Sequence, residues 1–193
     1  MRAIRIMDSG LFTTIQDLGR YGYQRYGVSV SGAMDEFSVK IANKLVGNSH
    51  NEAVLETTLK GVNIEFLSDC VFAITGGECD ITLNGNIIDT WRSYRAKSGD
   101  IIKMGICKEG MRNYLAFSGG IDVPTVMNSR STDIRAGIGG INGKKIMTHD
   151  ILHLSNHNSS RIPLKKFNEK YRQTYQNKIE IRVVLGQQAD YFT

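Results

Sequence analysis

The chain has 193 residues, of which 41% are hydrophobic and 22% charged, with 20 glycines and two prolines. This composition is typical of a globular protein with many tight turns, and it excludes a disordered or collagen-like chain. The length suits one well-buried domain plus a remainder. The net charge of +5 lies in residues 156–178, which hold six bases and one acid, so the rest of the chain is neutral. A nucleic-acid-binding protein would spread its basic residues along one face with interleaved aromatic residues, so binding to nucleic acid is not expected here.

The cysteines and the N-terminus indicate the compartment. Cys70, Cys79 and Cys107 are odd in number and lack a CxxC spacing, so neither a disulfide framework nor a zinc site is expected. The chain starts without an apolar signal segment and has no run of about 18 apolar residues. We predict a cytoplasmic protein with reduced thiols and no membrane association.

Taken in chain order, the sequence predicts a short strand around Ile4 and Ile6, then an irregular stretch over residues 13–32. Apolar residues at three- and four-residue spacings predict a helix from about Ala33 to Val46, with Ser31 as its cap.

Beyond this helix the sequence predicts almost only short strands, joined by hairpin dipeptides at Asn84-Gly85 and Asn142-Gly143. This pattern is typical of an antiparallel barrel or sandwich. The predicted strands are 54–59, 62–66, 71–75, 80–83, 87–90, 101–104, 113–117 and 151–154.

The last part of the chain reads differently. Residues 156–160 are a polar break, and residues 164–175 are compatible with a basic helix. A fresh strand then begins at Ile179, and the sequence stops eight residues after that strand ends at Leu185, which suggests a truncated chain.

Four segments in this order resemble one family: Thr13–Gly22, Gly27–Asn48, Leu55–Gly61 and Tyr114–Thr132. The family is the biotin-dependent carboxyltransferase-like group. It contains the C component of prokaryotic 5-oxoprolinase, which is also called KipA or allophanate hydrolase subunit 2, and the carboxyltransferase part of urea amidolyase. The chain departs from the usual pattern at Asn128, His149 and Gln187, which lie beside predicted turns.

The resemblance implies a mainly β fold with two tandem cyclophilin-like barrels. Residues 1–155 would be the first barrel with one main amphipathic helix, 156–178 a basic linker, and 179–193 the opening strand of a second barrel whose remainder is missing. It also implies a KipI-like B component of 5-oxoprolinase as partner, an A component in the pathway, and ATP with Mg as co-substrate of the complex.

Phosphorylation of the lactam oxygen of 5-oxoproline concentrates negative charge on oxygen, which arginines and hydroxyl or amide donors would stabilise. Arg20 and Arg130 are therefore the first candidates, although each could instead tie its loop to a carboxylate such as Asp17 or Asp133. Asp35 and Glu56 are candidate general bases, although Asp35 in the first turn of the helix could instead offset the helix dipole. The candidate substrate-binding residues are Gly32, Ala33, Met34, Asn43, Gly119, Gly120, Ser129, Ser131 and Thr132.

Other motifs fail on spacing. Gly143-Lys144 invites a phosphate-loop reading, but the motif needs glycine at position 138 and Ser or Thr at 145, where the chain has Ile138 and Lys145. His149 and His153 would form a metal pair only on a helix, and their segment is predicted to be a strand, so no metal site is expected.

The leading function is therefore one component of an ATP-dependent 5-oxoprolinase, acting together with the KipI-like partner. One alternative is carboxyl transfer from carboxybiotin to urea or an allophanate-type substrate, for which biotin would be the cofactor. The other is a non-catalytic antagonist that sequesters a KipI-like kinase inhibitor, in which the arginines would serve as interface anchors.

Overall fold

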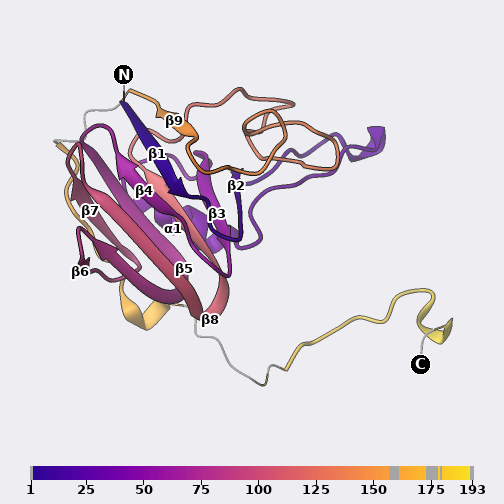
Figure 1. Ribbon diagram of the computed structural model, residues 1–193. Coiled ribbons are helices and arrows are strands. Elements are labelled where there is room, and N and C mark those ends of the chain that lie inside the picture. Colours follow the sequence, from indigo (N-terminus) through magenta and orange to yellow (C-terminus); the bar gives the residue numbers. More distant parts are fainter. Residues whose placement is uncertain (1, 157–160, 173–177, 179, 192–193) are drawn as a thin grey trace.

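The computed structural model describes residues 2–156, 161–172, 178 and 180–191, and its regular structure is dominated by one curled antiparallel sheet (Figure 1). The predicted mainly β fold with one main helix is confirmed. The strands are β1 (Arg2–Asp8), β2 (Phe12–Gln16), β3 (Val54–Thr58), β4 (Asn63–Phe66), β5 (Cys70–Leu83), β6 (Asn86–Ile87), β7 (Arg92–Ala96), β8 (Ile101–Phe117) and β9 (Ile151–Leu154).

The sheet runs in the order β2-β3-β8-β4-β1-β9, and β5 pairs with β6, β7 and β8. The strands β5 and β8 are 14 and 17 residues long, so the prediction of two short strands in each place is wrong. Their register shifts three times between Gly76 and Ile81. Such bulges insert extra residues without ending the strand, and they break the alternation on which the sequence prediction relied.

Alternation along the central strands gives the sheet two apolar faces. Phe72 and Leu115 belong to the cluster inside the curl, with the side chains of β1 and β4. Val71 and Ala116, each one position away, belong to a second cluster on the opposite face. The second cluster packs under α1 (Glu36–Leu45), whose Val39, Ala42 and Leu45 are buried. The helix therefore covers the outer face of the curled sheet.

The helix begins later than predicted. Its N-cap is Asp35, whose side chain accepts a hydrogen bond from the Ser38 amide at 3.1 Å, so the prediction of Ser31 as the cap is wrong. Ser31 instead has φ of 54°, a turn conformation. Met34 precedes the helix and is 73% exposed, so it is not part of the core. The sequence prediction also missed β7, and it treated β2 as irregular.

After β9 the described chain has little regular structure. A bridge joins Lys166 to Arg92 of β7, and the Phe167 ring lies 5.5 Å from that of Trp91. Two short 3-10 helices, η3 (Glu169–Tyr171) and η4 (Ala189–Tyr191), follow β9, and another, η1 (Gln24–Tyr26), lies earlier, between β2 and α1. Part of the predicted basic helix, residues 173–175, lies outside the described residues. Residues 180–185 form no strand here, and the second barrel stays a prediction. No helix in the described parts of the chain is long and apolar enough to cross a membrane.

Candidate functional site

A pocket of about 460 Å³ opens where β2 and β3 meet the loop before α1. We call it the β2–β3 pocket. Its walls combine both signs of charge with glycine and hydroxyl groups. The lining residues are Phe12, Thr14, Gln16, Ser31, Gly32, Ala33, Met34, Glu56, Arg112, Thr132, Asp133, Ile134 and Arg135.

Glu56 contributes a buried carboxylate to this wall. Glu56 is only 6% exposed, and its Oε1 lies 2.8 Å from Nη1 of Arg112. Its Oε2 accepts a hydrogen bond from the Met34 amide at 2.8 Å. The sheet sets this pair, because Thr58 is opposite Arg112 in the register and Glu56 is two residues along the same face of β3. A charged carboxylate is thus held beside a guanidinium whose side chain stays 26% exposed.

Tyr114 connects this wall to the helix. Its side chain is fully buried, and its hydroxyl accepts a hydrogen bond from the Asp35 amide at 2.9 Å. Burial, followed by the negative charge of Glu56, raises the pKa of Tyr114 well above its ordinary value. The hydroxyl therefore stays protonated, and it ties the N-terminus of α1 to the base of the pocket.

Two polar atoms in the pocket lining have no hydrogen-bond partner among the described residues, Oε1 of Gln16 and Oγ1 of Thr132. The Gln16 amide nitrogen is used, since it donates to Thr14 Oγ1 at 2.9 Å and to the Thr132 carbonyl at 3.2 Å. Buried polar atoms are nearly always paired with protein, water or ligand. Both atoms have almost no exposed surface, so they lie beneath the pocket wall and are not open to a molecule in the pocket.

Arg20 does not line the pocket. Its side chain is fully buried, and Nη2 donates to the Ser131 carbonyl at 2.5 Å. Nε and Nη1 have no hydrogen-bond partner within the described part of the chain. No ion pair links Arg20 to Asp17 or Asp133 among the described residues, so the predicted tie to either carboxylate is absent there.

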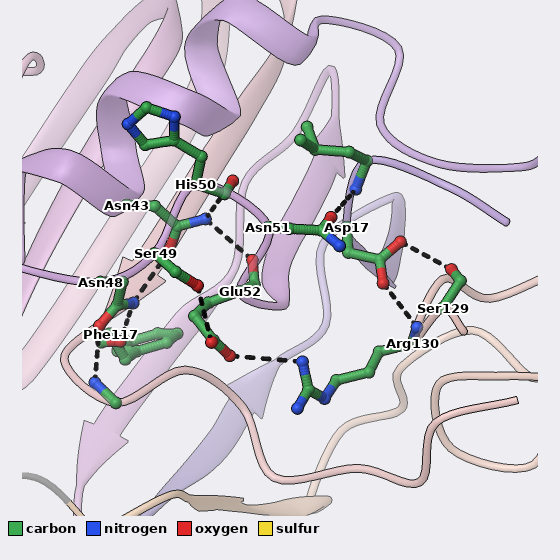
Figure 2. A network of polar contacts seen from close by, with 12 residues as sticks. Asp17, Asn43, Asn48, Ser49, His50, Asn51, Glu52, Phe117, Ser129 and Arg130 are labelled. Atoms are coloured by element: carbon green, nitrogen blue, oxygen red, sulfur yellow. Dashed lines mark hydrogen bonds and ion pairs between the residues drawn. The ribbon is translucent and has the colours of Figure 1, made fainter. Parts of the chain in front are cut away.

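The Ser129-Arg130-Ser131 run is instead organised around the carboxylate of Asp17 (Figure 2). Asp17 is 1% exposed and accepts hydrogen bonds from Ser129 Oγ at 2.7 Å, from Ser131 Oγ at 2.5 Å and from the Arg130 amide at 2.6 Å. It also accepts from the Gly19 amide at 2.8 Å. The two serine hydroxyls are therefore already engaged in holding this loop.

The Arg130 side chain points the other way, toward Glu52, with 3.3 Å between Nη1 and Oε2 (Figure 2). The backbone carbonyl of Glu52 accepts from Asn43 at 2.8 Å, and Asn43 accepts from Asn48 at 2.9 Å. Asn48 in turn accepts from the Gly119 amide at 2.8 Å. These contacts connect segments that carry the family resemblance.

The candidate substrate-binding residues Gly119 and Gly120 have no free backbone amide in this structure. The Gly119 amide donates to Asn48, and the Gly120 amide donates to the Phe117 carbonyl at 2.8 Å. Asp35 caps α1 and does not line the pocket.

The structure thus divides the predicted site residues into two groups. Those in the β2–β3 pocket are Gly32, Ala33, Met34, Glu56 and Thr132. Those outside it, in loop, cap or turn contacts, are Arg20, Asp35, Asn43, Gly119, Gly120, Ser129, Arg130 and Ser131.

Sequence reasoning missed several residues of the pocket: Thr14, Gln16, Arg112, Asp133 and Arg135. Gln16 lies inside a motif that matches the family, so the motif itself was a signal that could have found it. Arg112 precedes the Tyr114 motif by two residues, and only the register of β3 against β8 reveals it as the partner of Glu56.

Comparison with known proteins places these motifs in a family. Residues 26–193 match the model of the carboxyltransferase domain, subdomains A and B. The chain is 43% identical over 149 residues to the C component of 5-oxoprolinase from Escherichia coli. The matched region covers 77% of this chain and 48% of that protein. It therefore spans about half the length of that relative.

The chain is also similar to a much longer class of protein. It is 40% identical over 160 residues to urea amidolyase of Saccharomyces cerevisiae, and the matched region covers 82% of this chain and 9% of that protein. The crystal structure of K. lactis urea amidolyase superposes with a TM-score of 0.83 at 36% identity, covering 91% of this chain and 11% of that one. The chain belongs to the carboxyltransferase-domain family that includes the C component of 5-oxoprolinase and urea amidolyase.

Proposed function

We propose that this chain is part of the C component of an ATP-dependent 5-oxoprolinase. With a KipI-like B component it would activate 5-oxoproline, and an A component would complete ring opening to glutamate in the cytoplasm. The observation that carries the proposal is the 43% identity over 149 residues to the C component of 5-oxoprolinase.

The chemistry of the pocket supports a small polar anion as ligand. 5-Oxoproline presents a carboxylate and a lactam, that is, one anion, one N–H and one carbonyl oxygen. Arg112 and Arg135 are suited to the carboxylate, because guanidinium groups bind carboxylates through paired donors.

Glu56 has a positioning role in this proposal. Its carboxylate fixes Arg112 and the Met34 amide, and thereby the shape of the pocket wall. ATP with Mg²⁺ would be the co-substrate of the complex and would supply the phosphoryl group to the lactam oxygen. The residues of this chain would bind and orient the ring while that transfer takes place.

A second candidate is carboxyl transfer to urea or a related amide, with carboxybiotin as the donor. The observation that favours it is the match to the carboxyltransferase model and to the urea amidolyase structure. The same pocket would then hold an uncharged amide, for which the arginines are not needed to balance a charge.

The test is ATP hydrolysis by the assembled complex of this gene product with its two partner components, with and without 5-oxoproline. Arg112→Lys should raise the KM for 5-oxoproline at least about 10-fold, because a lysine cannot make a bidentate contact. The matched control is Arg5→Lys, which alters another cross-strand Arg–Glu pair, with Glu65 at 2.7 Å, away from the pocket.

Each outcome decides between the candidates. Stimulation by 5-oxoproline that Arg112→Lys weakens and Arg5→Lys preserves would support the proposal. An intact complex that 5-oxoproline does not stimulate, but that uses carboxybiotin and urea, would favour carboxyl transfer. An intact complex without either activity would favour a sequestering role.

A further inference from the structure

Two of the three cysteines face each other across the central strands. Cys79 of β5 and Cys107 of β8 are direct partners in the antiparallel register, although 28 residues separate them in the chain. Both side chains belong to the inner face of the sheet, where Cys79 is buried in the core cluster and Cys107 packs against it, partly exposed. Their side chains therefore point to the same side.

The sulfur atoms share one acceptor. The Asn113 Oδ1 atom lies 3.0 Å from Sγ of Cys107 and 3.6 Å from Sγ of Cys79. Asn113 is held in place, because its amide nitrogen donates to the Gly77 carbonyl at 2.6 Å. Both thiols donate to this one carbonyl oxygen, so a single amide group holds the two sulfur atoms on the same side of the sheet.

The backbone suits a covalent link between the two. Directly opposed residues in antiparallel strands have Cα atoms about 4.5–5.5 Å apart, within the roughly 4.4–6.8 Å that disulfides span. The register shifts on both sides of Cys79, so the local strand geometry is already irregular. A bulged ladder adjusts to a disulfide more easily than a regular one, since fewer paired hydrogen bonds resist the change.

Small reagents can reach each cysteine, because the Cys107 side chain is partly exposed and Cys79 borders a pocket. Cys79 lines a second pocket of about 260 Å³, bordered by Trp91 and Phe167 and separate from the β2–β3 pocket. Cys70 is less accessible than this pair. Its side chain is 2% exposed and in hydrogen-bond contact with the Ser118 hydroxyl, and burial raises the pKa of its thiol.

We propose that Cys79 and Cys107 form a redox-active dithiol that closes to an intramolecular disulfide on exposure to hydrogen peroxide. The sulfur of Cys107 attacks one peroxide oxygen, the O–O bond breaks, and a sulfenic acid and one water form. The sulfur of Cys79 then attacks the sulfenic sulfur and releases a second water. Two thiols are oxidised, and one peroxide is reduced to two waters.

The first test is thiol counting and peptide mapping of the wild-type chain under non-reducing conditions, before and after peroxide. We expect the free thiols to fall from three to one, with the Cys79 and Cys107 peptides linked and Cys70 still free. Thioredoxin or dithiothreitol should restore all three. Retention of all three thiols, or a link that joins two separate chains, would overturn the proposal.

Variants test the order of events. In Cys79→Ser, peroxide should leave a sulfenic acid on Cys107 that dimedone traps, whereas wild type should give little adduct because the disulfide forms. Cys70→Ser is the matched control and should still form the link. If Cys79→Ser does not fold, the wild-type peptide map decides alone. Stable sulfinic acid on Cys107 of wild type, with Cys79 unmodified, would overturn the inference.

Discussion

Glu56 is a buried carboxylate whose charge is balanced by Arg112 and one backbone amide. Arg112→Ala should lower the free energy of unfolding by about 1–3 kcal/mol, because it leaves the carboxylate buried with one donor fewer. Urea denaturation measures the change. The control is Lys108→Ala, whose pair with Asp80 is exposed on both sides and which should leave the free energy of unfolding nearly unchanged. Equal losses in the two variants would contradict a buried role for the Glu56 pair.

Asp133 makes a pH-dependent contribution at the rim of the pocket. The Ser29 hydroxyl donates to its carboxylate and holds the pKa of Asp133 below its ordinary value of 3.8. A carboxyl whose pKa is lower when folded adds stability above its unfolded pKa and loses it as pH falls through the folded pKa. Ser29→Ala should therefore raise the pKa of Asp133, and the resulting loss of stability at neutral pH should vanish in acid.

The measurement is an NMR titration of the Asp133 carboxyl carbon in wild type and in Ser29→Ala. Ser49→Ala is the control, because the Ser49 hydroxyl donates to Glu52 and does not contact Asp133. If the Asp133 titration is the same in all three proteins, the Ser29 hydrogen bond is not the cause of the shift.

For single residues, the sequence predicted which residues are important better than it predicted the role of each one. Glu56 was a candidate general base, and the structure pairs its carboxylate with Arg112, a partner that only strand register could identify. Arg20 and Arg130 were candidates for stabilising negative charge on oxygen. The serines beside Arg130 instead serve loop packing, since the Ser129 and Ser131 hydroxyls donate to Asp17. A short motif does not reveal which way its side chains point.

The helix α1 depends on its first turn. Asp35 accepts from the Ser38 amide at 3.1 Å and from the Ser38 hydroxyl at 2.6 Å. Asp35→Ala should reduce the free energy of unfolding by about 0.5–2 kcal/mol, as expected for loss of an N-cap. Asp35→Asn should retain most of it, because asparagine caps about as well. Thermal denaturation compares the two.

The same pair of variants separates capping from catalysis. A general base is lost in both Asp35→Ala and Asp35→Asn, whereas a cap is lost only in the first. Activity that collapses in Asp35→Asn with stability retained would restore Asp35 as a catalytic candidate.

Elements with a strict local signal were predictable. The apolar spacing of α1 and the Asn84-Gly85 turn between β5 and β6 needed only local sequence, and Asn84 has the positive φ of 52° that this turn requires. The full lengths of β5 and β8 were not predictable. Their middle portions continue through bulges held by pairing with distant strands, which no local pattern encodes.

Over the whole molecule, segments distant in the chain meet at one end of the sheet. The loop before α1 reaches Glu56 of β3 through Met34, and Gln16 of β2 reaches the carbonyl of Thr132. The family resemblance predicted that these segments belong together, and it predicted the fold class correctly. It did not predict which of their residues face a pocket, because that depends on the curl of the sheet.

The central position of strand β8 determines which part of the sheet unfolds last. Residues 113–115 are flanked by β3 on one side and β5 on the other, and the side chains of 113–117 are fully buried. Native-state hydrogen exchange should therefore find their amides among the slowest, with protection that tracks global unfolding. Amides of β6, which pairs with one strand only, should exchange through local fluctuations. The Tyr114 anchor beneath Glu56 would then persist until the entire sheet is lost, so partial unfolding elsewhere should leave that pocket wall intact.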